Sequence, residues 1–117
     1  MMLDWNEYQK EIGAKAVELA KLSPDTVRGY RTLSDANAKT TALGPKIREL
    51  ISLAVAVTTQ CDGCIVIHTD AAIKAGATRE EIAEALGVAV AMNAGAALVY
   101  STRALDAYAA KSAAAAG

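Results

Sequence analysis

The sequence predicts an all-α protein, a bundle of about five to six helices around a central antiparallel helix hairpin. Alanine is by far the commonest of the 117 residues, and it favours helices over strands. Aromatic residues make up only 4% and phenylalanine is absent, which argues against a β-sandwich or barrel. Apolar residues also recur every three to four positions, which is the period of an amphipathic helix.

Length and charge bound the possible functions. A chain of 117 residues suits a single domain over residues 1–117. The formal net charge of -1 provides no basic surface for nucleic acid, and 53% hydrophobic residues exclude a disordered chain. Because a small alanine-rich core gains limited burial energy, we expect homo-oligomers.

Cap residues delimit the first two helices. Asp4, followed three positions later by Glu7, predicts a capping box that opens the first helix. Ser23 and Pro24 end it and open the second, with Ser23 as the N-cap and Pro24 as the first helical residue. We expect the second helix to run to about Ala38, before a polar connection.

The third and fourth helices form the hairpin. Pro45 opens the third, whose apolar residues surround it almost completely and predict burial on nearly all sides. The polar run 58–60 ends it. The fourth helix is expected to start around Cys61 and to run to Ala75, with Gly76 as the glycine that stops it.

A long apolar helix completes the fold. Thr78 with Glu81 predicts a second capping box at its start. Asn93 and Gly95 are expected to bend or break it before it resumes to about Tyr108.

An uncharged segment, residues 85–102, is about as long as a short membrane span. It consists largely of alanine and glycine, contains Asn93 and has no tryptophan belt, so a buried helix is predicted and not a span. Residues 112–117 are expected to fray. The N-terminal residues 1–7 lack the basic and apolar regions of a signal peptide, so we expect a cytoplasmic protein.

The segment CDGCIVIH, residues 61–68, carries the candidate chemistry. In a helix, Cys61, Cys64 and His68 share one face, and they are the only cysteines and the only histidine. A CxxC pair at a helix start can form a disulfide and favours thiolate. An imidazole one turn away can accept and return the proton, whereas the Asp62 carboxylate opposes the thiolate.

Plainer interpretations stay open. The cysteines can be small core residues. The two cysteines and the histidine, with Glu49, can bind zinc, although zinc sites usually use two separated ligand pairs and no second pair exists, so no metal is expected. Glu49 can instead belong to a surface charge group with Arg48 or Lys46.

Residues 46–56 (KIRELISLAVA), 61–68 (CDGCIVIH) and 75–86 (AGATREEIAEAL) resemble the carboxymuconolactone decarboxylase superfamily, most closely its alkylhydroperoxidase D-like branch. The likeness covers about residues 24–108, and the glutamate, cysteine pair, histidine and capping box keep the family's spacing. It implies an all-α fold, trimers or hexamers, and a thiol peroxidase that reduces a small hydroperoxide by a dithiol–disulfide cycle without a bound cofactor. An external dithiol or a thiol protein is the implied reductant.

Carried over by position, the resemblance implies that Cys64 attacks the peroxide and Cys61 resolves, while His68 and Glu49 relay protons. The helix dipole alone favours Cys61 as the thiolate. Because Glu49 lies twelve residues before Cys61, about 18 Å along a straight helix, it can approach His68 only across a hairpin.

Two other functions remain in view. A lactone decarboxylase-like lyase would use His68 and Glu49 for acid–base work, although decarboxylase members of the superfamily lack the cysteine pair. A non-catalytic helical oligomer would use the pair as a redox-set disulfide and a stripe of small residues for close helix approach: Ala85, Ala89, Asn93 and Ala97.

Overall fold

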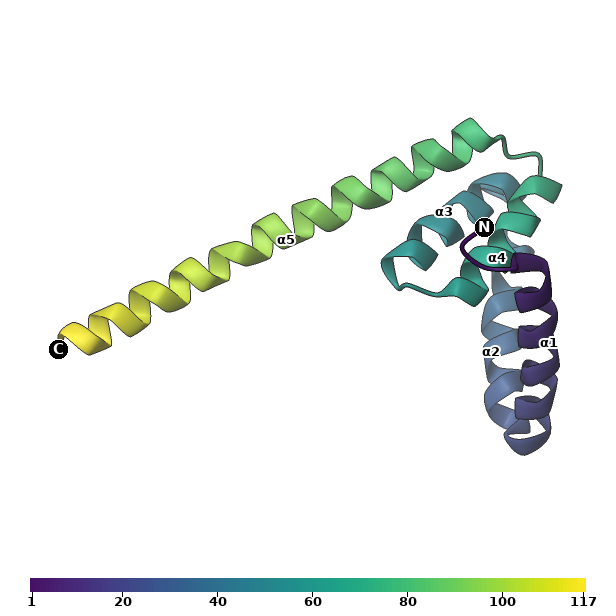
Figure 1. Ribbon diagram of the computed structural model, residues 1–117, viewed down its shortest axis with the longest axis horizontal. Helices are drawn as coiled ribbons and strands as arrows, with labels where there is room; N and C mark the ends of the chain where they lie inside the picture. The colour runs from purple at the N-terminus through teal and green to yellow at the C-terminus, as the bar shows by residue number, and fades with distance from the viewer.

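The computed structural model describes all 117 residues and contains only helices, as Figure 1 shows. The predicted all-α class is therefore confirmed, with five α-helices and one short 3-10 helix. In chain order the elements are α1 (Trp5–Leu22), α2 (Pro24–Ala36), η1 (Asn37–Lys39), α3 (Gly44–Thr58), α4 (Asp62–Lys74) and α5 (Arg79–Ala116).

The hairpin of α3 and α4 forms the centre of the fold, as predicted. The chain reverses at Gln60, whose φ of 55° is the left-handed conformation that a sharp turn requires. The Cys61 amide then donates to the Ala56 carbonyl at 3.1 Å, which ties the turn to the end of α3. On one side α5 packs against α3, and on the other α1 packs against α4 and α2. The buried residues all belong to α3, α4 and α5: Leu53, Ala56, Val66, Ala72 and Ala89.

The predicted caps are only partly right. Thr78 and Glu81 form the complete capping box at the start of α5. At the start of α1 only half of the box forms, in which the Asp4 carboxylate accepts a first-turn backbone N–H at 3.1 Å. Ser23 does not cap α2 with its side chain; its hydroxyl donates to the Thr26 hydroxyl at 2.8 Å.

The expected break in α5 is wrong. The helix is continuous through Asn93 and Gly95 and extends to Ala116, so the end that was expected to fray is helical too. The Asn93 amide donates to the Ala89 carbonyl at 2.7 Å and to the Thr58 hydroxyl at 2.9 Å, so it reinforces the helix rather than interrupting it. Alanine, the best helix former, dominates the rest of the tail.

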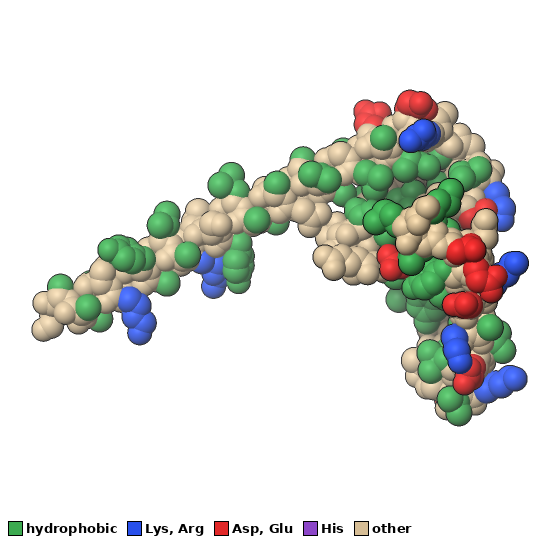
Figure 2. All heavy atoms as spheres, in the orientation of Figure 1, with side chains coloured by type: hydrophobic (Ala, Val, Ile, Leu, Met, Phe, Trp, Pro, Cys, Tyr) green, Lys and Arg blue, Asp and Glu red, His purple; other side chains and the backbone are tan.

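Burial is far lower than the sequence predicts. Only five of 117 residues are buried, and α3 exposes one side of its surface, including Ile47 and Val55. In Figures 1 and 2, α5 projects away from the body with apolar side chains along its length. The radius of gyration is 19.9 Å, against about 13 Å for a compact domain of this length. The expectation that α5 is buried is therefore wrong for a single chain, because no other element covers its distal half.

By length and composition, α5 is the one helix that can cross a membrane, and 6% of its most apolar window is buried within the chain. The uncharged apolar segment noted in the sequence therefore lies in a helix long enough to span a membrane, but the chain does not bury this segment as predicted.

Candidate active site

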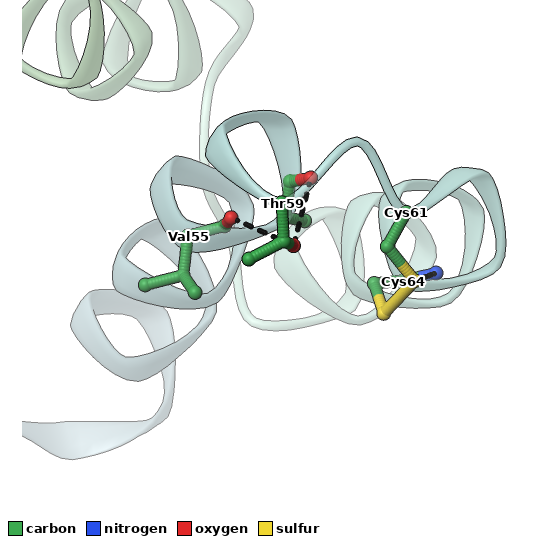
Figure 3. The surroundings of a disulfide bond; sticks show 5 residues. Val55, Thr59, Cys61 and Cys64 are labelled. Atoms are coloured by element: carbon green, nitrogen blue, oxygen red, sulfur yellow. Dashed lines mark hydrogen bonds between the residues drawn. A yellow bond between two sulfur atoms is a disulfide. The ribbon is translucent and has the colours of Figure 1, made fainter. Parts of the chain in front are cut away.

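The two cysteines are joined by a disulfide at the start of α4 (Figure 3). Cys61 is the extended N-cap residue and Cys64 lies in the first turn, with 5.2 Å between their Cα atoms. The Cys64 backbone N–H donates to the Cys61 sulfur at 3.2 Å. Both residues are half-buried. The predicted CxxC geometry at a helix start is present.

The segment before the disulfide is anchored to α3. The Thr59 hydroxyl donates to the carbonyls of Val55 and Ala56 at 3.1 and 3.3 Å, as drawn in Figure 3. In the spacer between the cysteines, a Cβ at Gly63 would lie 3.0 Å from the Ile12 Cδ1 atom, so α1 packs closely against this spacer. Contacts with α3 and α1 therefore hold the start of α4, and with it the disulfide, in place.

A hydrogen-bonded carboxylate–imidazole pair lies across the hairpin. The Glu49 Oε2 atom of α3 is 2.7 Å from the His68 Nδ1 atom of α4, and their side chains are 23% and 32% exposed. With a proton on Nδ1, this bond fixes the ring and leaves Nε2 available for proton transfer. Cys64 lies one helical turn before His68 on the same helix. The sequence required a hairpin for Glu49 to approach His68, and the α3–α4 hairpin brings the two side chains into direct hydrogen-bond contact.

The alternative surface charge group around Glu49 does not form. Lys46 instead pairs with Glu81 at 3.1 Å and so joins the start of α3 to the start of α5. Arg48 donates from Nη1 to the Thr40 carbonyl at 2.8 Å. Sequence reasoning missed both contacts, because each depends on where a distant segment folds back.

Two exposed carboxylates elsewhere are held in the ionised form. A hydrogen bond from Lys46, followed by one from the Thr78 backbone, lowers the pKa of Glu81 from its ordinary value. A hydrogen bond from Lys74 lowers the pKa of Asp70. Each carboxylate is engaged by a lysine, so neither is a free acid–base group. Glu49 remains the carboxylate in contact with the imidazole.

A pocket of about 400 Å³ opens beside the Glu49–His68 pair. It lies between the hairpin and the segment that links α2 to α3, and seven of its ten lining residues are polar or charged. In this disulfide form both sulfurs are bonded to each other, and no three His, Cys, Asp or Glu side chains converge to hold a metal ion. The pocket is lined by Ser34, Asn37, Ala38, Thr40, Leu43, Arg48, Glu49, Ile51, Ser52 and His68.

The α3–α4 hairpin thus carries the CxxC disulfide together with the hydrogen-bonded Glu49–His68 pair. This chain belongs to the carboxymuconolactone decarboxylase family, whose model matches residues 24–107. The family resemblance predicted from the sequence is confirmed, and α1 lies outside the matched region.

Relatives and solved structures agree with this assignment. The chain is 47% identical over 108 residues to an uncharacterised protein of Haemophilus influenzae, covering 92% of this chain and 96% of that protein. Its fold is similar to the apo form of a carboxymuconolactone decarboxylase family protein from Legionella pneumophila, with a TM-score of 0.71 and 39% identity over 87% of this chain and 91% of the other. A protein from Methanobacterium thermoautotrophicum is similar with a TM-score of 0.66 and 30% identity, over 72% of this chain and 94% of the other.

Proposed function

We propose that this protein is a thiol-dependent peroxidase of the alkylhydroperoxidase D-like kind. One observation carries the proposal: the Cys61–Cys64 bridge begins the helix on which His68, hydrogen-bonded to Glu49, follows one turn later. A bridged pair at a helix N-terminus has both a disulfide state and a favoured thiolate state, which a redox cycle requires.

The first chemical step starts from the reduced pair. The Cys64 thiolate attacks the terminal oxygen of a hydroperoxide, so that a sulfur–oxygen bond forms and the oxygen–oxygen bond breaks. The alkoxide that leaves takes a proton from His68 and departs as an alcohol. Cys64 is now a sulfenic acid. Glu49 holds the imidazole through Nδ1 while Nε2 exchanges the proton.

The second step closes the disulfide. The Cys61 thiolate attacks the Cys64 sulfur and expels hydroxide, which leaves as water after protonation. Peroxide and two thiols have then become alcohol, water and one disulfide. The Cys64 backbone N–H, which lies 3.2 Å from the Cys61 sulfur, favours negative charge on Cys61. This contact makes Cys61 a good leaving group when the bridge is reduced, while the order in which Cys64 attacks and Cys61 resolves follows from the family resemblance.

An external dithiol or a thiol protein would reduce the bridge by exchange and is itself oxidised to a disulfide. Such reductants are kept available in the cytoplasm, which is the compartment we propose. We also propose a homo-oligomer, a trimer or a hexamer. The support is the large apolar surface that a single chain leaves uncovered on α3 and α5.

The test is thiol counting. Reduced protein is mixed with excess tert-butyl hydroperoxide, and free thiols are titrated. Loss of both thiols per chain is expected, with recovery after dithiothreitol. In the Cys61→Ser variant, a sulfenic acid on Cys64 should be trapped by dimedone, whereas Cys64→Ser should consume no peroxide. Two thiols that survive excess peroxide would reject the proposal.

A lactone decarboxylase-like lyase is the second candidate, because the Glu49–His68 pair can do acid–base work without sulfur. The Cys61→Ser/Cys64→Ser double variant separates the two functions. A lyase retains its turnover of a lactone substrate in that variant, whereas the peroxidase loses all activity.

A further inference from the structure

The pocket beside the Glu49–His68 pair contains a guanidinium that no carboxylate neutralises. Arg48 is half-buried and donates only from Nη1, to the Thr40 backbone carbonyl at 2.8 Å. The ion pairs of the chain involve other cations. The carboxylate next to it in the sequence, Glu49, is already engaged by His68 at 2.7 Å. The remaining N–H groups of Arg48 are therefore free to bind a ligand.

Other donors in the pocket are free as well. Ser34 and Asn37 also line the pocket; both are exposed, and neither side chain makes a hydrogen bond within the chain. Ser52, by contrast, uses its hydroxyl to bond the Arg48 carbonyl at 2.9 Å. Arg48, Ser34 and Asn37 thus each provide donors that a ligand rich in acceptors can use.

We propose that this pocket binds a carboxylate, and that Arg48 selects small hydroperoxides that carry one; this inference rests on the proposed peroxidase function. A planar guanidinium fork matches the two oxygens of a carboxylate. The apolar part of such a substrate has Leu43 and Ile51 to contact, and its hydroperoxide end lies toward His68, one turn from Cys64.

Charge limits the ligand to a single negative group. The Glu49 carboxylate also lines the pocket and is hydrogen-bonded to His68. One guanidinium offers its fork to one carboxylate, whereas a phosphate dianion would place a second negative charge next to Glu49. A monoanionic carboxylate is therefore favoured over phosphate.

His68 is the only histidine, so its ring resonances report on this pocket without ambiguity. The disulfide form of the protein is titrated with butyrate, with butyramide and with inorganic phosphate, and the imidazole signals are followed by NMR. Butyrate is expected to shift them saturably, while butyramide and phosphate have little effect. Arg48→Gln should weaken butyrate binding about tenfold or more, Arg48→Lys less. Arg79→Gln, an equal change of charge at the exposed start of α5, should have no effect.

Equal binding of butyramide, preference for phosphate, or unchanged butyrate affinity in Arg48→Gln would overturn the carboxylate site. Kinetics then test selectivity: the wild-type protein should reduce a hydroperoxy acid with a lower KM than its methyl ester, and Arg48→Gln should remove this difference. If the wild-type protein reduces the methyl ester with the same KM as the acid, Arg48 does not select the substrate, while the proposed peroxidase function still stands. If the protein binds butyrate but reduces no hydroperoxide, the proposed peroxidase function is wrong, and the pocket is a carboxylate-binding site only.

Discussion

Reduction of the Cys61–Cys64 bridge is expected to lower the free energy of unfolding only slightly. The bridge joins residues three positions apart, so it closes a loop of four residues and constrains the unfolded chain by about 2 kcal/mol in the loop-entropy estimate. The Cys64 N–H also donates to the Cys61 sulfur in the disulfide form, and if this cap of α4 is kept on reduction it cancels from the difference. The net loss should be about 2 kcal/mol.

This small value matters for function, since a catalytic pair must leave the protein folded in both redox states. Urea unfolding is followed by circular dichroism at fixed protein concentration, with and without a phosphine reductant. The Cys61→Ser/Cys64→Ser variant is the control, because it should match the reduced protein and ignore the reductant. A loss above about 4 kcal/mol, or melting of helix on reduction, would refute the reasoning and identify the bridge as a structural staple.

Three further changes test the site and its supports. His68→Asn should lower the peroxidase kcat/KM by about 10²–10⁴-fold, and Glu49→Gln by less, as measured by hydroperoxide consumption. Because the pKa of Glu81 is lowered, its contribution to stability is present above the unfolded value of about 4.5 and is lost as pH falls through the folded value. Glu81→Gln should therefore reduce the loss of the free energy of unfolding at acidic pH. A loss as steep as that of the wild-type protein would contradict this. Gly63→Ala should change the free energy of unfolding by less than about 1 kcal/mol, because gained helix propensity offsets contact with the flexible end of Ile12, whereas Gly63→Val should destabilise by about 1–3 kcal/mol in the same urea assay.

The hairpin and the catalytic candidates were readable from the sequence because local rules govern them. Helical periodicity places Cys64 one turn before His68 whatever the tertiary fold. Covalent spacing required a chain reversal for Glu49 to meet the imidazole, and the turn at Gln60 provides it. Thr78 likewise specifies its capping box within four residues.

Long-range features were not readable in the same way. The Arg48 bond to the Thr40 carbonyl depends on how the chain between α2 and α3 folds back, which no local pattern encodes. Asn93 signals a helix break in isolation, yet here its amide finds the Thr58 hydroxyl on α3. The apolar side chains of α5 predict that this helix packs against other protein segments, but the pattern does not tell whether those segments belong to the same chain.

The length of the apolar segment of α5 indicates whether a membrane or another protein chain covers it. A membrane span needs about 30 Å of apolar helix, and the uncharged segment of α5 is residues 85–102. Its first part is already used within the chain, since Ala89 is buried and Asn93 bonds to α3. Residues 94–102 remain, which span only about 14 Å, and the charged residues Arg103 and Asp106 follow. A second copy of the chain is therefore the better cover.

A substitution in the projecting part of α5 tests this reasoning. Leu98 is 74% exposed, and covering such a side chain contributes about 1.5–3 kcal/mol. Leu98→Glu should therefore shift sedimentation velocity at micromolar concentration from an oligomer toward a monomer. Leu22→Glu, at an equally exposed site at the end of α1, should leave the oligomer intact. A wild-type protein that sediments as a monomer while α5 stays protected from hydrogen exchange would sink the idea, since an uncovered helix end of this length is only marginally stable in water.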